Sequence, residues 1–341
     1  MRLYFQFQKN CAIPYMKDEL LRRLLVSIPQ LLLMSFITFL FIDLAPGDVL
    51  AQYRFDPRIS EETVREVEAK YHFDKPVLIQ YGHWLLRAVR GDLGYSFSRH
   101  APVSSVISER LFNTFILSLF SVIITWVVAI PLGIYAAVRQ YSWGDRIMSV
   151  ISYVGMSLPT FFVALLLMFF VYLCRDLPLI SMIPTTGMIS AGYGQMGFFG
   201  KMADRALHMV VPVTVLTITA LAGLQRISRG NMLEELRKQY VTTARAKGLP
   251  ENRVIYRHAL RNAINPLITL FGFEFSSLLS GAALLEIIMN WPGLGSLMLS
   301  AVQTQDTFLV MGSLLLAGLM LIAGNLLADI LLVVADPRVR S

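Results

Sequence analysis

Long apolar stretches alternate with polar segments along the whole chain. Six of them stand out, at residues 22–44, 111–138, 147–174, 207–225, 265–288 and 307–335. A helix needs roughly 17–25 apolar residues to cross about 30 Å of hydrocarbon, and each stretch is long enough. Since a bilayer core offers no water to backbone N–H and C=O groups, spanning segments of this kind fold as helices. The pattern therefore predicts an all-α integral membrane protein with six transmembrane helices.

The composition agrees with that class. Apolar residues make up 55% of the 341 residues, charged residues make up 16%, and the mean hydropathy is +0.57. Soluble domains carry roughly 25% charged residues, because their surfaces must be solvated. The scarcity of charge therefore excludes a disordered chain, a disulfide scaffold and an ordinary soluble enzyme.

The distribution of basic residues predicts the orientation of the helices. With the N-terminus inside the cell, the cytoplasmic segments hold 18 Lys and Arg residues, and the two short outer loops hold 3. Lys and Arg in short loops stay on the cytoplasmic side, so both termini are expected inside. The segment 45–110 holds nine basic and nine acidic residues. It is longer than the roughly 60 residues over which loop charge reports orientation.

This segment, 45–110, is expected to be a small folded insert on the outer, periplasmic side. Ser60 can cap a helix whose first turn holds Glu61 and Glu62, which suit the positive end of the helix dipole. Apolar residues then recur at helical spacing, at Val64, Val67 and Tyr71. The expected order is a cytoplasmic tail 1–21, a first transmembrane helix 22–44, the insert 45–110, a core of five transmembrane helices 111–335 and a cytoplasmic C-terminus 336–341.

The loop between the fourth and fifth apolar stretches, residues 226–263, is the most informative polar segment. Asn231 followed by Glu234 resembles a capping box and predicts a helix start. Lys247 and Gly248 predict its end, because a cation suits the last turn and glycine can take the left-handed conformation. Pro250 then predicts the start of a second helix. The expected structure is therefore two helices joined by a tight glycine turn at the cytoplasmic surface.

The charge of this loop has a simpler interpretation as well. Its nine basic residues could anchor the loop to anionic lipid, or bind nucleic acid. Neither interpretation accounts for the glycine break or for the small residues Thr242, Thr243 and Ala244 beside it. Small side chains let the backbone of another protein approach closely, so a protein partner is the expectation that we carry forward.

The same loop resembles the coupling motif of ABC-importer permeases, in the version found in the dipeptide/oligopeptide/nickel permease family of type I importers. The matching residues are Tyr240-Val241-Thr242-Thr243-Ala244-Arg245-Ala246-Lys247-Gly248, then His258-Ala259-Leu260-Arg261-Asn262-Ala263 and Pro266. The resemblance runs from about Leu20 to the end of the chain. It includes Ala45-Pro46-Gly47-Asp48, Asp74-Lys75-Pro76, Gly91-Asp92-Leu93-Gly94-Tyr95-Ser96, Trp291-Pro292-Gly293-Leu294-Gly295 and Asp336-Pro337-Arg338. Thr242 departs from the general motif, which has a Glu at that position.

The resemblance implies a permease subunit in the bacterial inner membrane. It implies a second homologous permease subunit, two cytoplasmic ABC ATPase subunits and a periplasmic or surface solute-binding protein as partners. The residues implied in ATPase docking are Tyr240, Thr242, Thr243, Ala244, Arg245, Ala246, Lys247, Gly248, His258 and Asn262. Those implied in contact with the binding protein are Trp291, Pro292, Gly293 and Gly295. Peptides are the expected cargo, with nickel chelates, glycosides and antimicrobial peptides left open.

Polar residues inside the expected spans are candidates for the transport pathway. A charge at the centre of a bilayer costs roughly 2.5–3.5 kcal/mol, so such residues avoid the lipid face. Small polar residues also suit helix packing. The candidates for pathway or packing roles are Glu274, Ser277, Ser280 and Glu286.

Other chemistry is missing from the sequence. Gly200-Lys201 is followed by Met202, so there is no phosphate-binding G-x-x-x-x-G-K-[ST] loop. The five histidines form no metal-binding pattern. We therefore expect no catalytic activity, metal or cofactor in this chain, with ATP and Mg bound by the ATPase subunits. An ion-gradient-driven transporter or channel is the alternative, and it would show inverted repeats, which the sequence lacks.

Overall fold

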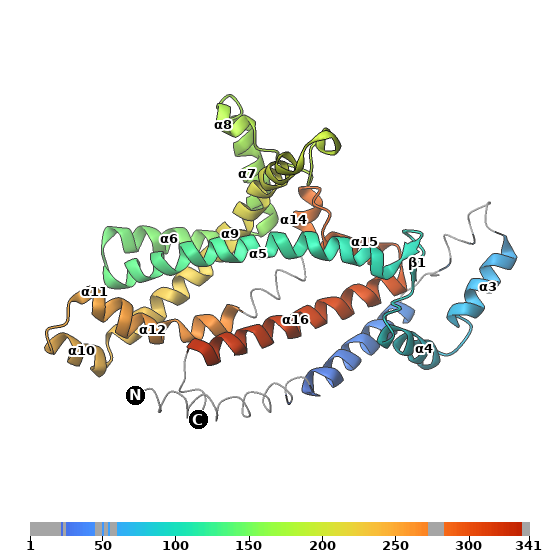
Figure 1. Cartoon of the computed structure of the whole chain (residues 1–341), viewed down its shortest axis with the longest axis horizontal. Helices are drawn as coiled ribbons and strands as arrows, with labels where there is room; N and C mark the ends of the chain where they lie inside the picture. The colour runs from blue at the N-terminus through green and yellow to red at the C-terminus, as the bar shows by residue number, and fades with distance from the viewer. Residues whose placement is uncertain are drawn as a thin grey trace. The chain divides into compact units, whose positions relative to one another are not determined.

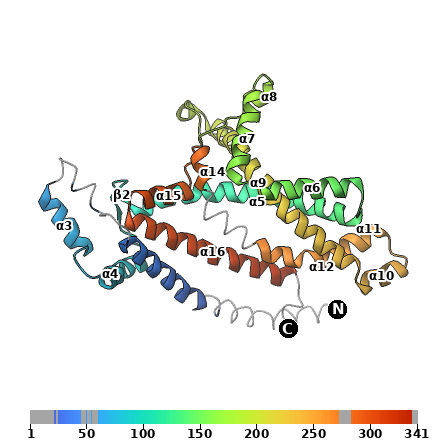
Figure 2. The ribbon, with the colours of Figure 1, turned by 180° about the vertical axis from the view of Figure 1, so that it is seen from behind.

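The computed structural model describes residues 22, 25–44, 50, 54, 60–271 and 283–335 (Figures 1 and 2). The described residues are almost entirely helical. Four of the described helices are long and apolar enough to cross a membrane: Leu25–Leu44, α5 (Val103–Val138), α9 (Phe198–Leu236) and the part Thr307–Leu327 of α16 (Thr307–Ala335). These helices agree with the prediction of an all-α membrane protein, while six spans and their orientation stay predictions.

The third expected span, 147–174, is not one continuous helix. It is divided into α6 (Trp143–Ser157) and α7 (Thr160–Leu173), which meet at an angle of 110°. The cause is Pro159, because proline disfavours the helical conformation in the residue before it. Leu158 accordingly has an extended ψ of 127°, which ends α6 one residue earlier.

The other expected spans differ from the structure at their ends. The helix predicted over 111–138 begins eight residues earlier, at Val103, and 207–225 lies within the 39 residues of α9. The fifth span, 265–288, lies partly outside the described residues, which show a helix over 265–271 and α14 (Ala283–Ile288). The prediction of 307–335 coincides with α16. The predicted tails, 1–21 and 336–341, lie outside the described residues.

The described chain divides into two compact units. The first unit contains the N-terminal helix, the insert and the first part of α16. Its other elements are α3 (Glu61–Tyr71), α4 (Val77–Val89), α15 (Leu294–Gln303) and a two-stranded antiparallel sheet in which β1 (Tyr95–Ser96) pairs with β2 (Ala101–Pro102). The cap predicted for α3 is confirmed, because the Ser60 hydroxyl accepts a hydrogen bond from the Thr63 amide at 3.2 Å.

An aromatic core holds the insert to the start of α16. The rings of Tyr71 and Phe73 lie 5.0 and 5.5 Å from the ring of Phe308, measured between centroids. The Arg87 guanidinium lies 4.8 Å from the centre of the Tyr71 ring, a cation–π contact. Trp84 is fully buried beside them. The apolar face that helical spacing predicted for the insert therefore packs into a core that it shares with α15 and α16.

The buried carboxylate of Asp306 connects the hairpin to α16. One oxygen, Oδ2, accepts hydrogen bonds from the Ser96 hydroxyl at 2.7 Å and from the amide and hydroxyl of Ser98 at 2.9 and 2.8 Å. The other oxygen accepts from the Leu309 amide at 3.2 Å and so caps the first turn of α16. A single side chain thus satisfies a helix end and fixes a loop that is about 200 residues away in the sequence.

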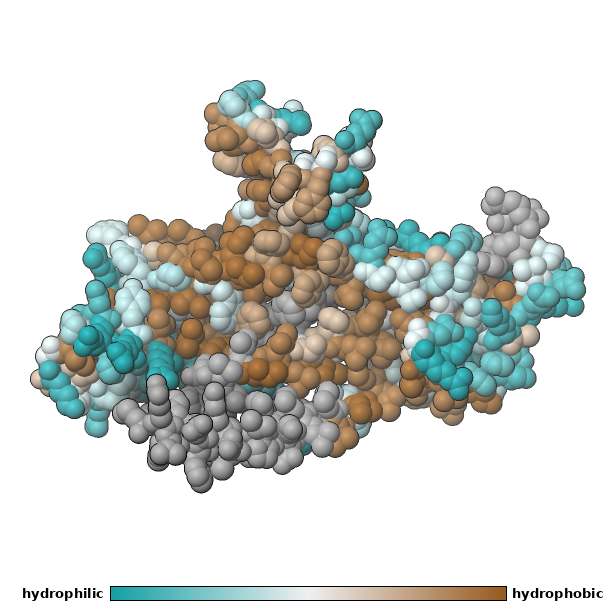
Figure 3. All heavy atoms as spheres, viewed as in Figure 1, coloured by the Kyte–Doolittle hydropathy of each residue, from teal (hydrophilic) through white to brown (hydrophobic). Residues whose placement is uncertain are grey.

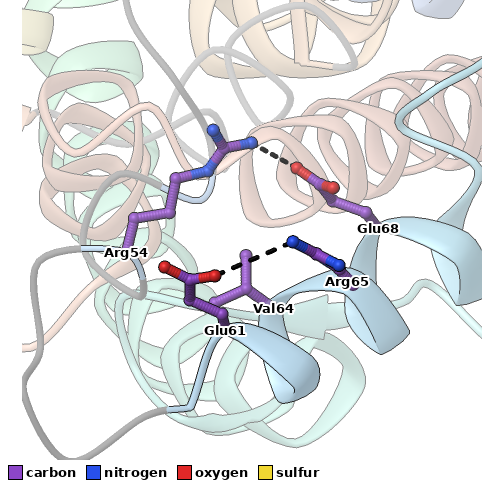
Figure 4. Close-up of a pocket in the computed structure, with 5 residues that line it drawn as sticks. All are labelled: Arg54, Glu61, Val64, Arg65 and Glu68. Carbon is purple, nitrogen blue, oxygen red and sulfur yellow. Dashed lines mark hydrogen bonds and ion pairs between the residues drawn. The ribbon is translucent and has the colours of Figure 1, made fainter.

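A polar hollow of about 280 Å³ lies against α3 (Figure 4). Two ion pairs cross it, one between Arg54 and Glu68 and one between Arg65 and Glu61. Val64 supplies its apolar floor. Because the basic and acidic side chains that line the hollow neutralise one another, its charge favours neither an anion nor a cation.

The second unit is built on α9. Helices α6 and α7 pack on α9, and the short elements α8 (Pro178–Ser181) and η1 (Tyr193–Gln195) belong to the connection between α7 and α9. Helix α5 crosses α9 closely at Gly133, where a β-carbon would lie 2.6 Å from Cβ of Ser228. Small residues at helix crossings let two backbones approach within a membrane. Apolar side chains cover the exposed faces of α6 and α7 (Figure 3), as lipid contact requires.

The hairpin motif Gly91 to Ser96 offers a test of the packing of the insert. Both Gly91 and Gly94 have a positive φ, of 85° and 97°, but only at Gly94 would a β-carbon lie close to another described side chain, 2.9 Å from the Phe308 ring. We predict that Gly91→Ala costs about 1 kcal/mol of local stability through backbone strain, and that Gly94→Ala adds about 1–3 kcal/mol of overpacking. Trypsin should therefore cleave residues 60–110 at least fivefold faster in Gly94→Ala than in Gly91→Ala. Equal cleavage rates would show that overpacking against Phe308 adds nothing to the loss of stability in Gly94→Ala.

Candidate functional site in the loop 226–263

The loop 226–263 begins as a continuation of α9. The structure corrects the helix start predicted at Asn231, because α9 runs on to Leu236. The apolar and polar residues that α9 buries continue in register past Asn231, with Met232 and Glu235 both buried, so packing favours a continuous helix. Two residues, Arg237 and Lys238, then separate α9 from α10 (Gln239–Ala246).

The glycine turn lies where the sequence predicts it. Helix α10 ends at Ala246, and Gly248 has a φ of 75°. The Gly248 amide donates to the Arg245 carbonyl at 2.9 Å, and the Leu249 amide donates to the Ala244 carbonyl at 3.4 Å. This pair of hydrogen bonds is the Schellman motif, which satisfies the last carbonyls of a helix and needs a left-handed residue.

After the turn, the chain returns as a second helix with an irregular centre. Pro250 precedes α11 (Glu251–Arg253), a π-helical turn η2 (Val254–Ala259) follows, and α12 (Leu260–Ala263) completes the segment. The start at Pro250 matches the prediction, whereas nothing in the sequence pattern indicates the π-helix. π-Helical turns are rare and occur frequently at functional sites. Figure 1 shows α10, α11 and α12 gathered at one end of α9.

An apolar core fixes the two helices of the loop to each other and to α9. Its members, each less than 9% exposed, are Ile134, Ala137, Met232, Val241, Ala244, Val254, Ile255, Ala259 and Ala263. Among the residues implied in docking, Ala244 therefore faces inward. It fixes the position of α10 and leaves the outer face to its neighbours.

The outer face of the turn consists of small and basic residues. Those exposed are Thr242, Thr243, Arg245, Ala246, Lys247 and Gly248. The Arg245 guanidinium donates to the Glu251 carboxylate at 2.6 Å across the turn. This hydrogen bond holds the pKa of Glu251 below its usual value, so the ion pair is fully charged at neutral pH. The turn therefore presents a surface of small, weakly basic side chains, and the apolar core beneath α10 holds this surface in place.

Tyr240 and Asn262, both implied in docking, meet inside the loop. The Tyr240 hydroxyl donates to a carboxylate oxygen of Glu235 and accepts from the Asn262 amide at 2.9 Å. Burial and the bond to Glu235 raise the pKa of Tyr240. His258 is half-buried, and its carbonyl oxygen lies 3.5 Å from the same hydroxyl. These residues therefore connect the helices of the loop and do not form its outer face.

The remaining predicted site residues lie elsewhere. Glu274, Ser277 and Ser280 lie outside the described residues. Glu286 is buried in α14, at 2% exposed. Trp291 is 3% exposed, Gly293 and Gly295 are buried, and Pro292 is partly buried. The end of α14 explains the position of Trp291: its amide donates to the Glu286 carbonyl at 2.7 Å after Asn290, which has a φ of 49°. Trp291 is thus a packing residue of this chain, whereas Asn290 is exposed beside it.

Sequence reasoning missed an ion pair between Asp145 and Arg229. Arg229 binds both carboxylate oxygens of Asp145, through Nε at 2.6 Å and Nη2 at 2.8 Å, and Asp145 is 3% exposed. Asp145 also accepts from the Tyr141 amide, while the Ser142 hydroxyl accepts from the Asp145 amide. Ser142 is a typical N-cap residue and Asp145 lies three residues later, so the sequence indicates a helix start here. The partner Arg229 carries no such signal.

The ion pair of Asp145 should matter more than the exposed pair of Arg245 and Glu251. We predict that Asp145→Ala lowers the free energy of unfolding by about 3 kcal/mol, because it leaves a partly buried guanidinium without its buried carboxylate. Glu251→Ala should cost less than about 1 kcal/mol, since exposed pairs are screened by water. The midpoint of thermal unfolding in detergent measures both. The double variant Asp145→Ala/Arg229→Leu should recover part of the loss, and no recovery would contradict the assignment.

Comparison with known proteins places the chain in a family. Residues 129–341 match the family described as binding-protein-dependent transport system inner membrane component, and residues 16–118 match the N-terminal family of the same transport system membrane components. The chain is 37% identical to the oligopeptide transport system permease protein AppB of Bacillus subtilis (strain 168), over 95% of this chain and 99% of the relative. It is 36% identical to the dipeptide transport system permease protein DppB of Escherichia coli (strain K12), over the same shares. The chain therefore belongs to the inner membrane components of binding-protein-dependent transport systems, and it is a permease subunit of an ABC importer and not an enzyme.

Proposed function

We propose that this permease imports peptides and that the outer face of the turn at Gly248 docks on a cytoplasmic ABC ATPase. The relatives named as oligopeptide and dipeptide permeases support the cargo class. The observation that carries the docking site is the exposed row of small and basic residues around Gly248, held on the apolar core beneath α10. The basic residues favour a neutral or acidic groove as its receptor.

The membrane topology is part of the proposal. Six spans with both termini inside agree with the 18 basic residues assigned to cytoplasmic segments against 3 in the short outer loops. The insert 45–110 is then periplasmic. A second homologous permease, two ATPase subunits and a solute-binding protein complete the transporter, and ATP and Mg bind to the ATPase subunits. Lipid surrounds the exposed apolar faces.

The geometry of α9 suggests how ATP drives the permease. Helix α9 continues through Pro212 in its interior, and its 39 residues make it about 58 Å long, which exceeds the thickness of a bilayer. Movement of the ATPase at the turn would therefore be carried along α9 into the membrane. ATP binding would favour one of two arrangements of the helices, as a population shift requires. We assign the pathway itself to Glu274, Ser277, Ser280 and Glu286.

We assign the contact with the solute-binding protein to the outer loops. The segment Trp291, Pro292, Gly293 and Gly295 is expected to shape this surface from within, because its members are buried or partly buried. Direct contact would then fall to exposed neighbours such as Asn290.

Substitutions of Gly248 test the docking site. No described atom lies within 4 Å of the place that a β-carbon would take there, so a larger side chain projects outward without a clash, while the φ of 75° strains any residue other than glycine. We predict that Gly248→Trp abolishes co-purification with the ATPase subunits and reduces ATP-driven uptake of tritiated trialanine at least tenfold. Gly248→Asn should retain both within about threefold, because Asn tolerates a positive φ at modest cost. A fully assembled and active Gly248→Trp variant would refute the proposed docking surface.

Single cysteines test the orientation independently. In a variant with Cys11 and Cys174 replaced by Ser, we place one cysteine at Thr243 and another at Arg65, both exposed positions. A membrane-impermeant maleimide should label position 65 in intact spheroplasts and position 243 in inverted membrane vesicles alone. Labelling of both positions from the same side would exclude the proposed topology.

A further inference from the structure

The junction between α9 and α10 is the place where force applied to the docking surface would have to pass. Helix α9 ends at Leu236 and α10 begins at Gln239, so two non-helical residues separate them. Lys238 has an extended conformation, with φ −71° and ψ 148°. Such a break between helices can act as a hinge, because a few residues at element ends absorb changes in backbone angles. Without a brace, α10 could tilt while α9 stays in place.

A set of hydrogen bonds spans this junction. Glu235 lies in the last turn of α9 and is 9% exposed. Its carboxylate accepts from the Tyr240 hydroxyl in the first turn of α10 and from the Lys238 ammonium between the two helices. The Tyr240 hydroxyl also accepts from the Asn262 amide of α12, at 2.9 Å. One phenol oxygen thus joins three elements of the loop.

The Glu235 carboxylate is both charged and largely buried, so the loss of its hydrogen-bond partners would be costly. Hydrogen bonds to an ionised carboxylate are roughly twice as strong as bonds between neutral groups. A largely buried carboxylate needs such partners, because an unpaired buried charge is costly. The ring of Tyr240 packs at the same time on the apolar core beneath α10. Helix α10 is therefore held at its first turn by Tyr240 and further along by Val241 and Ala244.

We infer that Glu235, Tyr240 and Asn262 form a latch that makes α10 move as one body with α9 when the ATPase moves. The inference rests on the proposed docking of the turn at Gly248. The three residues are positioning residues, because they lie behind the docking surface. Their task is to transmit the movement of the turn to α9.

Tyr240→Phe tests the latch, because it removes the hydroxyl and keeps the ring in the apolar core. The experiment uses the complete transporter with its ATPase subunits in lipid nanodiscs. Hydrogen–deuterium exchange is measured over residues 226–236, with and without ATP and vanadate. The wild-type complex should show an ATP-dependent change in protection of these amides, and Tyr240→Phe should reduce this change at least fivefold while the ATPase subunits stay bound.

Two matched variants separate transmission from folding. Glu235→Gln keeps a side-chain carbonyl that can accept from Tyr240, so it should restore at least half of the ATP-dependent change seen in the wild type. Glu235→Ala, which offers no acceptor, should behave like Tyr240→Phe. Gln239→Ala, at an exposed position of α10 that is not part of the docking surface, should leave the change intact. If Glu235 had only a structural role, the ATP-dependent change would not differ between Glu235→Gln and Glu235→Ala in this way.

The outcomes distinguish the latch from the proposed function. An unchanged ATP-dependent response in Tyr240→Phe would overturn the latch and leave the docking site standing. Loss of ATPase binding in Tyr240→Phe would overturn it too, because the hydroxyl would then be needed for assembly. A wild-type complex without any response over 226–236 would refute transmission through α9. Failure of the proposed function would appear separately, as Gly248→Trp retaining its ATPase subunits.

Discussion

The interior of a bilayer provides no water, and this constraint governs where polar contacts occur in the protein. Backbone groups are satisfied inside helices, so the groups left over are those at helix ends. Among the described residues, two buried carboxylates serve such ends. Asp306 precedes α16 and accepts from the Leu309 amide in its first turn, and Asp145 lies in the first turn of α6 and accepts from the Tyr141 amide just before that helix. Each of them also binds a residue from another element, so the stabilisation of a helix end and the placement of a neighbouring segment are one and the same interaction.

This arrangement explains why the loop 226–263 is an ordered platform. Loops usually expose their backbone to water and move. Here Val241, Ala244 and Val254 bury their apolar side chains under the turn. At the start of α10, the Tyr240 hydroxyl donates to the Glu235 carboxylate. The exposed residues are consequently held at fixed positions by residues that a partner would never touch. A surface that is ordered in advance spends less free energy on becoming ordered when it binds.

The sequence predicts what local chemistry decides and misses what depends on distant contacts. The Ser60 cap, the Gly248 turn and the limits of α16 follow from neighbouring residues, and the structure confirms them. Asp306 pairs with Ser96, which is 210 positions away, and Asp145 pairs with Arg229, which is 84 away, so no spacing rule could indicate either bond. The helix start predicted at Asn231 is wrong, because continued burial of side chains along α9 stabilises one helix more than a local cap would stabilise a new one. The stretch 147–174 was expected to form one span, yet the effect of Pro159 on Leu158 turns the chain through 110°.

The division between buried and exposed residues also explains how the chain can have Thr242 where the general coupling motif has a Glu. The general coupling motif has a Glu at this position, and Thr242 lies on the exposed face of α10, beside the buried Val241. A change there alters the charge offered to a partner without disturbing the core beneath. With no acid at position 242, the acidic side chain next to the turn is Glu251, and Arg245 already neutralises it. The turn then carries Lys247 as an exposed cation. Under the proposed docking, a receptor for this turn therefore needs no basic group opposite position 242.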